Sequence, residues 1–176
     1  VKTLGYLLPT NAAELMVVLF ATLIGWPLPL LPIHLLWINL VTDGLPALAL
    51  ATDPVDANVL SRPPRPRQAQ LMDRAFLKRV ALTSLLTAAV TLVAFALEYY
   101  TSGDLNDARD AAFTVLVFSG ILRSFGARSN TDPVWRAGLF ANMRLFAVVL
   151  ASFLFQLAIH HVPALQEFFS VDPIGF

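Results

Sequence analysis

Residues 36–47 read LWINLVTDGLPA, an apolar run that carries three polar side chains and then reaches a glycine and a proline. The polar residues are Asn39, Thr42 and Asp43, and the helix-breaking residues are Gly44 and Pro46. The polar residues are spaced i, i+3 and i+4, so they share one face of a helix. A carboxylate in such an apolar run is unfavourable unless it has a role, and the rest of the sequence indicates what that role is.

The composition of the chain points towards lipid. Of its 176 residues, 57% are hydrophobic and 14% are charged, and the mean hydropathy is +0.67. Soluble domains average about 45–50% apolar and about 25% charged residues. The net charge is zero, which argues against a nucleic-acid partner, because such a partner needs a basic face. The lack of cysteine excludes disulfides, a thiolate metal site and thiol catalysis.

Five stretches are long and apolar enough for membrane helices, which need about 20 largely apolar residues. The expected spans are Leu4–Trp26, Pro32–Thr52, Phe76–Tyr99, Ala111–Ala127 and Leu139–His161. The fourth is the weakest because Arg123 lies inside it. The sequence predicts an all-α, polytopic transmembrane bundle of about five spans, the first two broken by proline, which forms one transport domain over residues 1–176.

The Lys and Arg residues in the loops and near the ends of the spans are sorted by side. Eleven of the twelve Lys and Arg residues lie before the first span, around residues 53–74, or around residues 128–138. Only Arg109 lies on the other side, at the acidic loop 100–110. The positive-inside rule therefore predicts a cytoplasmic N-terminus and two cytoplasmic loops. A soluble helical bundle is the alternative, but random placement would rarely sort charges in this way.

The loop at 53–74 is rich in proline and arginine. Pro63, Pro64 and Pro66 favour an extended polyproline segment, which is stiff enough to act as a strut or a docking surface. The alternative is a solvated connector whose arginines bind anionic lipid headgroups. The sequence leaves both interpretations open.

The three histidines carry less information than the acidic residues. His34 lies at the outer edge of the second span, and His160 and His161 lie at the outer end of the fifth. Interfacial packing or pH-sensitive solvation explains them better than a metal site.

Two carboxylates fall at membrane depth. Glu14 lies about ten residues from either end of the first span, and Asn11 precedes it by three residues on the same face. A charged residue at the centre of a membrane helix costs about 2.5–3.5 kcal/mol on insertion scales. Glu14 and Asp43 are therefore expected to face each other, or a wet cavity, inside the bundle.

Proline and glycine loosen the backbone beside these side chains. Pro46 has no N–H group, and its ring clashes with the carbonyl of Thr42, four residues back. Gly44 tolerates the dihedral angles that a break requires, and Pro9 is expected to break the first span just before Asn11. Carbonyl groups freed within a membrane must be buried in protein or line a cavity.

Two carboxylates, two amides, a hydroxyl and freed carbonyls form an all-oxygen site, which suits a hard cation. Ca²⁺ takes about 6–8 oxygen ligands at about 2.3–2.6 Å. The predicted ligands are Asn11, Glu14, Asn39, Thr42 and Asp43. The alternative is that they only join helices through hydrogen bonds. The same oxygens would also serve Mn²⁺, Na⁺ or H⁺, so the sequence does not fix the ion.

These residues carry a resemblance to a known family. The run NLVTDGLPALALATDP at Asn39–Pro54, preceded by PIHLLWI and followed by SRPPR, resembles the sixth membrane helix and following loop of P-type cation-transporting ATPases. It is most like their calcium-pump branch. TNAAEL at Thr10–Leu15 resembles the fifth helix of that family, and VDPI at Val171–Ile174 resembles the stretch ahead of its tenth. The likeness covers essentially the whole chain, from the fifth helix through the ninth.

The resemblance implies a site and a coupling loop. The five predicted ligands match ion-coordinating positions of the family, and Asp43 would bridge two sites where two ions bind. The loop residues Asp53, Asp56, Arg62 and Arg65 would contact the phosphorylation domain and relay its state.

This sequence departs from the muscle-type calcium pumps at the eighth helix. Their carboxylate there is matched by Gly120, and Arg123 lies one turn further on. Both residues favour a single ion per cycle. Alternatively, Arg123 extends to the cytoplasmic face, as long basic side chains do at membrane interfaces.

Several parts of such a pump are absent from these 176 residues. They are the phosphorylated aspartate of the family's DKTGT motif, the nucleotide and actuator domains, and the fourth helix with its ligating glutamate. We therefore expect a part of a longer calcium pump that uses ATP and Mg²⁺ only through those domains and does not hydrolyse ATP alone. Its expected partners are the lipid bilayer and the remaining helices and cytoplasmic domains of the same pump.

Two rival functions remain open. One is a secondary cation transporter or channel that uses the broken helices without ATP, but it would need inverted repeats, and none is evident. The other is a non-transporting membrane scaffold whose basic loops bind a soluble partner.

Overall fold

The computed structural model describes residues 2–52, 72–127 and 142–169, and within these ranges the chain forms helices and short connections without a strand. The first elements are α1 (Lys2–Ile24), α2 (Pro32–Trp37), the π-helical segment η1 (Ile38–Asp43) and α3 (Gly44–Ala51). They are followed by α4 (Arg74–Thr101), α5 (Leu105–Gly126), α7 (Met143–His161) and the short α8 (Pro163–Phe169). The all-α bundle predicted from the sequence is confirmed.

Four stretches of helix are long and apolar enough to cross a membrane, by length and composition. They are Thr3–Ile24, Pro32–Ala51, Arg74–Thr101 and Met143–His161. α5 is a further long helix of 22 residues, which at about 1.5 Å per residue is also long enough for the hydrocarbon core. The helix expected at Ala111–Ala127 is therefore present, and it begins at Leu105.

Local capping explains where these helices begin and end. Asp104 accepts a hydrogen bond from the backbone N–H of Asn106 at 2.7 Å, which starts α5 early. Most of the outer loop expected at 100–110 is consequently helical. α1 is followed by Gly25 with φ 82°, and α4 by Gly103 with φ 74°. Glycine adopts this left-handed conformation without strain, so both helices end there.

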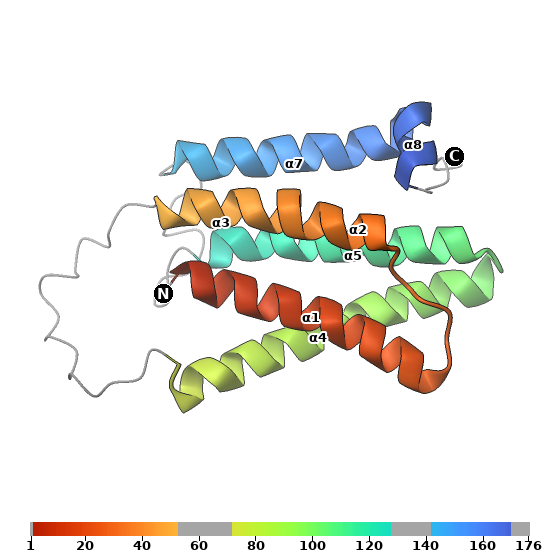
Figure 1. Ribbon diagram of the computed structural model, residues 1–176, viewed down its shortest axis with the longest axis horizontal. Coiled ribbons are helices and arrows are strands. Elements are labelled where there is room, and N and C mark those ends of the chain that lie inside the picture. The colour runs from red at the N-terminus through yellow and green to blue at the C-terminus, as the bar shows by residue number, and fades with distance from the viewer. Residues whose placement is uncertain (1, 53–71, 128–141, 170–176) are drawn as a thin grey trace, which may run out of the picture.

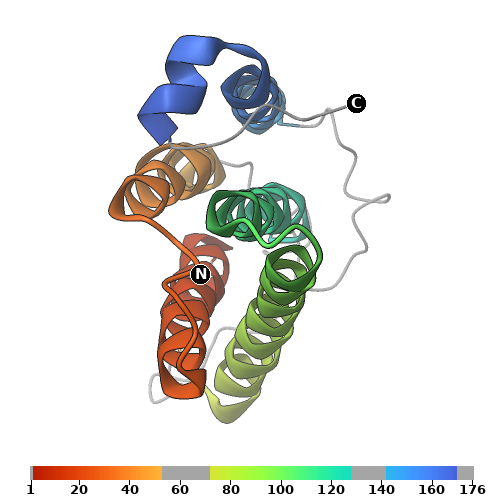
Figure 2. The ribbon, with the colours of Figure 1, turned by 90° about the vertical axis from the view of Figure 1, so that its right-hand side faces the viewer.

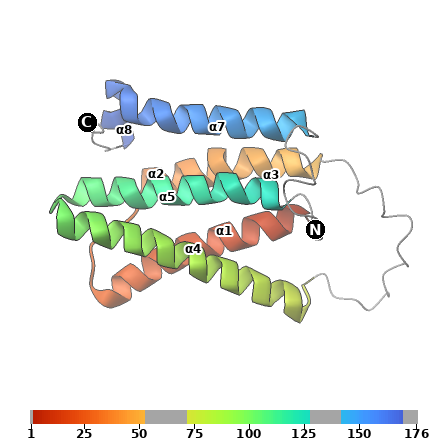
Figure 3. The ribbon, with the colours of Figure 1, turned by 180° about the vertical axis from the view of Figure 1, so that it is seen from behind.

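The long helices run side by side, with α7 beyond the α2–η1–α3 helix and with α1 and α4 crossing on the other side (Figure 1). The end-on view in Figure 2 places α5 in the middle of the bundle, where it contacts α1, η1, α3, α4 and α7. Figure 3 shows α4 and α5 adjacent to each other from behind. Because other helices surround it, α5 can carry charged residues that would disfavour a lipid-facing helix.

The outward surface of the bundle is apolar. Large hydrophobic side chains are exposed on several helices, including Leu15, Leu23, Leu86, Leu97 and Leu154. Polar side chains such as Ser84, Thr91 and Gln156 are buried instead. A soluble protein rarely exposes so much contiguous apolar surface, so the soluble alternative does not fit this bundle.

Candidate cation site

The π-helical segment η1 carries three of the predicted ligands, Asn39, Thr42 and Asp43. In a π turn each N–H bonds five residues back instead of four, and such turns often occur at functional sites. Pro46 follows soon after, and its missing N–H leaves the Thr42 carbonyl without its usual helical partner. The break expected in the second span is thus present, and it takes the form of a widened π turn between α2 and α3.

Gly44 serves this turn by its lack of a side chain. Its φ of −64° and ψ of −48° are ordinary helical values, so the break does not use the wider range of dihedral angles that glycine tolerates. A Cβ atom at this position would lie 3.1 Å from the carbonyl oxygen of Asn39. The widened turn brings the two backbone segments so close that any larger residue would require a shift.

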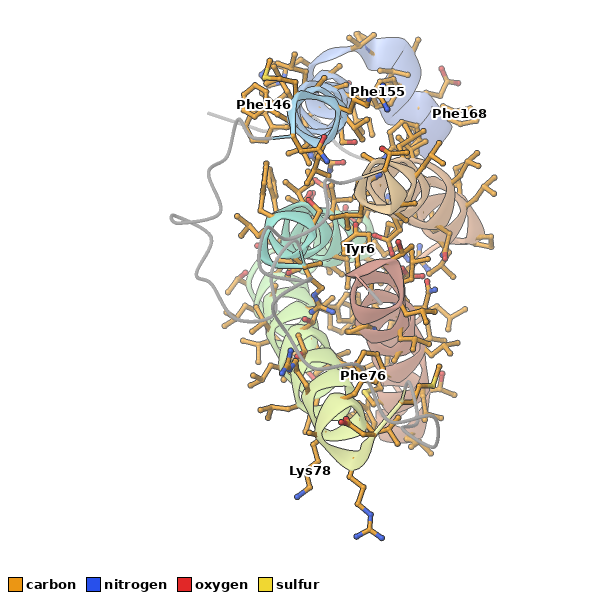
Figure 4. The ribbon with its side chains drawn as sticks, turned by 90° about the vertical axis from the view of Figure 1, so that its left-hand side faces the viewer. Tyr6, Phe76, Lys78, Phe146, Phe155 and Phe168 are labelled. Carbon is orange, nitrogen blue, oxygen red and sulfur yellow. The ribbon has the colours of Figure 1, made fainter. Side chains whose placement is uncertain are left out.

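Tyr6 of α1 is fully buried and points between the helices (Figure 4). Its hydroxyl lies 3.0 Å from the carbonyl oxygen of Thr42 and 3.0 Å from Asp43 Oδ1. A hydroxyl has one proton, so Tyr6 donates at any moment either to the carbonyl or to the carboxylate. Sequence reasoning missed this residue. The available signal was its spacing of eight residues from Glu14, about two turns along α1.

Glu14 of α1 and Asn39 of η1 are joined directly. Asn39 Nδ2 donates to Glu14 Oε2 at 2.7 Å and to the Leu35 carbonyl oxygen at 2.9 Å. Glu14 is 5% exposed, whereas Asn39 lies exposed at the edge of the bundle. The bond holds one oxygen of Glu14, and the other, Oε1, is buried without a hydrogen-bond partner among the described residues.

Four predicted ligands each have a buried oxygen atom with no hydrogen-bond partner in the described part of the chain. These atoms are Asn11 Oδ1, Glu14 Oε1, Thr42 Oγ1 and Asp43 Oδ2. A buried polar atom left unpaired costs about 1–3 kcal/mol, so a group of them points to a bound water or ion. All four are oxygens, the ligands that hard cations prefer. The described residues contain no group of three or more His, Cys, Asp or Glu suited to a metal.

Both carboxylates lie on one small cavity of about 10 Å³, close to the smallest volume that holds a water molecule. The residues that line it are Thr10, Glu14, Ile38, Asp43, Thr87, Leu116, Ser119, Gly120 and Arg123. The structure therefore brings Glu14 and Asp43 to a common space. Asn11 and Thr42 are not among the lining residues, although they lie on the same two elements.

α5 contributes a fixed cation to this cavity. Arg123 Nη2 donates to Thr87 Oγ1 of α4 at 2.6 Å. Its Nη1 is buried, with no hydrogen-bond partner among the described residues. The guanidinium thus lies inside the bundle beside the two carboxylates, and it does not extend to the end of α5.

Gly120 brings the backbone of α5 against the site. A Cβ atom there would lie 3.2 Å from Asp43 Oδ1 and 3.6 Å from Thr42 Cγ2. A larger side chain at this position would therefore displace the carboxylate or reach into its space.

Pro9 is the remaining backbone feature predicted from the sequence. It lies inside α1, which continues through it from Lys2 to Ile24. The carbonyl oxygen of Pro9 accepts a hydrogen bond from Ser84 Oγ of α4 at 3.1 Å. Pro9 thus marks a contact between α1 and α4 and does not end the helix.

Two groups of residues from the sequence predictions lie outside the described ranges. They are the loop residues Asp53, Asp56, Arg62 and Arg65, and the stretch Val171–Ile174.

The comparisons with known proteins agree on one family. The family described as "Cation transporting ATPase, C-terminus" matches residues 27–176. The chain is 38% identical to the "Calcium-transporting ATPase" of Bacillus subtilis over 96% of this chain and 19% of the relative. It is 36% identical to the "Probable cation-transporting ATPase F" of Mycobacterium tuberculosis over 98% of this chain and 19% of the relative.

A mammalian relative extends the comparison. The chain is 33% identical to the "Calcium-transporting ATPase type 2C member 2" of Mus musculus over 96% of this chain and 18% of the relative. The chain spans about a fifth of the length of these relatives. It belongs to the cation-transporting ATPase family and corresponds to the C-terminal membrane region of its members. With its apolar helices it is an integral, multi-pass membrane protein.

Proposed function

We propose that this chain forms part of the membrane cation-binding site of an ATP-driven pump, and that the transported ion is Ca²⁺. The observation that carries the proposal is the set of buried oxygen atoms that have no hydrogen-bond partner among the residues that the structure describes, two of them on carboxylates that line one cavity. Ca²⁺ prefers oxygen ligands, and two of the relatives are named as calcium-transporting ATPases. ATP and Mg²⁺ would act through domains that these 176 residues do not include.

Glu14 and Asp43 supply the negative charge of the proposed site, and Asn11, Asn39 and Thr42 supply neutral oxygens. In the inward-facing state the carboxylates hold the ion. After outward release they take up protons, because two buried charges without a cation would be strongly unfavourable. The cavity has room for about one water, so binding an ion with several ligands requires α1 and η1 to move apart.

We further propose that one ion is carried per cycle. Gly120 brings no carboxylate to the cavity, whereas Arg123 brings a guanidinium into it. Two carboxylates and one fixed cation leave a single negative charge, so a second divalent ion would meet net repulsion. A count of bound Ca²⁺ per phosphorylated pump is expected to give one, and a count of two would contradict this part of the proposal.

We also propose that the N-terminal end of α1 faces the cytoplasm. The start of α1, the end of α3 and the start of α4 lie at one end of the bundle (Figure 1). Lys78 projects away from the bundle at that end (Figure 4), close in sequence to Arg74 and Arg79. The positive-inside rule assigns such an end to the cytoplasm.

The Asp43→Asn substitution in a full-length pump that contains this chain tests the proposed site. Asparagine keeps the size of the side chain and removes its charge, so we expect Ca²⁺-dependent phosphorylation by ATP to be lost. The matched control is Asp107→Asn, which removes a carboxylate from the first turn of α5, away from the cavity, and should leave phosphorylation unchanged.

Retained Ca²⁺-dependent phosphorylation in Asp43→Asn would contradict the proposed function. The unfolding temperature of each variant, measured in lipid nanodiscs, separates a lost site from a lost fold. A scaffold would behave differently, because the double variant Glu14→Gln, Asp43→Asn would keep partner binding and lose nothing else.

A further inference from the structure

A second polar cluster, partly buried on α5 and buried on α7, lies between these two helices, at the end of the bundle opposite Arg74, Lys78 and Arg79 (Figure 1). It consists of Asp110 and Thr114 on α5 and of Gln156 and His160 on α7. Each pair is spaced i and i+4, so its two members lie on one face of their helix. About ten residues, or three turns of α5, separate Asp110 from Gly120 at the cation cavity.

The imidazole of His160 is the centre of this cluster. Its Nδ1 lies 3.4 Å from Asp110 Oδ2. Its Nε2 lies 3.4 Å from Thr114 Oγ1 and 3.5 Å from Gln156 Nε2. Thr114 Oγ1 also lies 3.4 Å from Asp110 Oδ1 and from Gln156 Nε2. A carboxylate therefore faces one ring nitrogen, and a hydroxyl and an amide face the other.

These contacts are long for their type. Hydrogen bonds in proteins are usually about 2.7–3.2 Å, and every contact within this cluster is longer than that range. Gln156 is 1% exposed, and its Oε1 is buried without a hydrogen-bond partner in the described part of the chain. His160 is 7% exposed, and its Nδ1 is also buried without a hydrogen-bond partner among the described residues. This nitrogen lies within ion-pair distance of Asp110. The cluster thus contains polar atoms that can form further hydrogen bonds.

The other titratable groups nearby are directed elsewhere. Arg109 donates through Nε to the carbonyl oxygen of Leu28. His34 of α2 is bonded through Nε2 to the carbonyl oxygen of Phe169. His161 is exposed and bonded to its own helix, and Glu167 of α8 is exposed. Within residues 2–52, 72–127 and 142–169, Asp110 and His160 are thus the ionisable pair that faces across the α5–α7 interface.

We propose that Asp110, Thr114, Gln156 and His160 form a proton-binding site that holds α7 against α5, separate from the cation site. The proton comes from the medium, adds to a ring nitrogen of His160, and returns to the medium when the pH rises. With the proton bound, an imidazolium faces the Asp110 carboxylate, and the cluster becomes neutral overall. The contact with Asp110 then becomes charge-assisted and can shorten, because ionised partners form shorter and stronger hydrogen bonds. The protonated Nε2 donates to Thr114 Oγ1, and the amide of Gln156 has to turn its Oε1 towards the ring, because its Nε2 only donates.

Hydrogen exchange of α7 tests the proposal in a full-length pump in lipid nanodiscs, where both faces share one pH. After correction for the intrinsic exchange rate, protection of Met143–His161 should be about tenfold higher near pH 5.5 than near pH 8, the range in which histidine titrates. His160→Gln should remove this pH dependence. His161→Gln, which changes the exposed neighbouring histidine, should retain it.

A double-mutant cycle separates a proton site from ordinary packing. Asp110→Asn and His160→Gln should be coupled near pH 5.5 and independent near pH 8, since only the protonated pair carries opposite charges. Equal coupling at both pH values, or persistent pH dependence in His160→Gln, would overturn the proposal. If His160→Gln does not fold, Asp110→Asn alone should abolish the pH dependence.

Two further results keep this proposal distinct from others. If added Zn²⁺ protects α7 from exchange and His160→Gln abolishes that protection, the cluster is a metal site and not a proton site. This result would overturn the assignment. Asp43→Asn should leave the pH dependence of α7 intact, so that failure of the proposed pump function and failure of this proposal are distinguishable.

Discussion

Tyr6 places a single proton between two acceptors, the Thr42 carbonyl and the Asp43 carboxylate. The first of these acceptors lacks its usual helical donor, because Pro46 has no N–H group. Under the proposed function, the second acceptor changes its need for a donor when an ion or a proton arrives. A tyrosine at this position can therefore stabilise the site in both conditions, because its hydroxyl rotates from one acceptor to the other.

The Tyr6→Phe substitution is expected to destabilise the bundle by about 1–3 kcal/mol, because it leaves two buried acceptors without their donor. It should also weaken Ca²⁺ binding by the full-length pump. Unfolding in nanodiscs and a Ca²⁺ titration measure the two effects.

The control is Tyr100→Phe. Tyr100 is 70% exposed, so this change should stay within about 0.5 kcal/mol of the parent. An unchanged stability in Tyr6→Phe would show that the hydroxyl has no role in holding η1.

The side chains of the site could be predicted from sequence better than their partners. Glu14 and Asp43 stood out because a carboxylate inside an apolar run has few physical explanations. Tyr6 did not stand out, because a tyrosine in a membrane helix is common in packing. The direction of Arg123 could not be predicted either, since its partner, Thr87, lies on another helix and 36 residues away in sequence.

At the scale of elements, the widened turn η1 is the feature that shapes the site. A regular α-helix would give Asn39, Thr42 and Asp43 a different relative position from the one that a π turn gives them. The sequence indicated that the helix would be disturbed at Pro46, because proline chemistry is local. It could not indicate the form of the disturbance, a π turn whose Thr42 carbonyl accepts a hydrogen bond from Tyr6 of α1.

The Pro46→Ala substitution separates the stability of this helix from its function. Alanine restores an N–H for the Thr42 carbonyl and removes a helix penalty of up to about 3 kcal/mol. We expect the helix to become more stable while Ca²⁺ affinity falls by about tenfold or more, which corresponds to about 1.4 kcal/mol. Thermal unfolding and Ca²⁺ titration should thus move in opposite directions.

Pro32→Ala provides the matched comparison on the same helix. Pro32 is exposed at the first position of α2, where a missing N–H breaks no helical bond. It should change neither measurement. A gain in both stability and affinity in Pro46→Ala would show that the π turn is not needed for binding.

The start of α5 shows that hydropathy alone does not locate every helix boundary. Its first two turns contain Asp107, Arg109 and Asp110, so the apolar signal begins later than the helix does. The cap at Asp104 and the surrounding helices decide the boundary, and the second of these is a tertiary effect.

At the scale of the whole molecule, the orientation in the membrane can be tested with single cysteines, because the chain contains none. Lys78→Cys and Ser102→Cys place exposed thiols at the two ends of α4. In a full-length pump with its other cysteines replaced, an impermeant maleimide should label Ser102→Cys in intact cells. It should label Lys78→Cys only after the membrane is permeabilised, and the reverse pattern would contradict the proposed orientation.

The architecture followed from the sequence because apolar length is a strong signal in a membrane. Packing order did not follow, since five apolar helices can be arranged around each other in several ways. The central place of α5 makes sense only in retrospect, because neighbouring helices there partly cover its charged residues Asp110 and Arg123.

Asn39 lies at the outer edge of this arrangement, exposed, while its amide holds the carboxylate of Glu14. An amide at such a depth is poorly solvated by acyl chains, so in the assembled protein we expect further polypeptide to cover this flank. An ion that approached from that side would have to part Asn39 from Glu14 before it reached the carboxylate. The hydrogen bond between Asn39 and Glu14 would then gate the entry of the ion from that side. The other wall of this entry path would belong to a part of the protein beyond these helices.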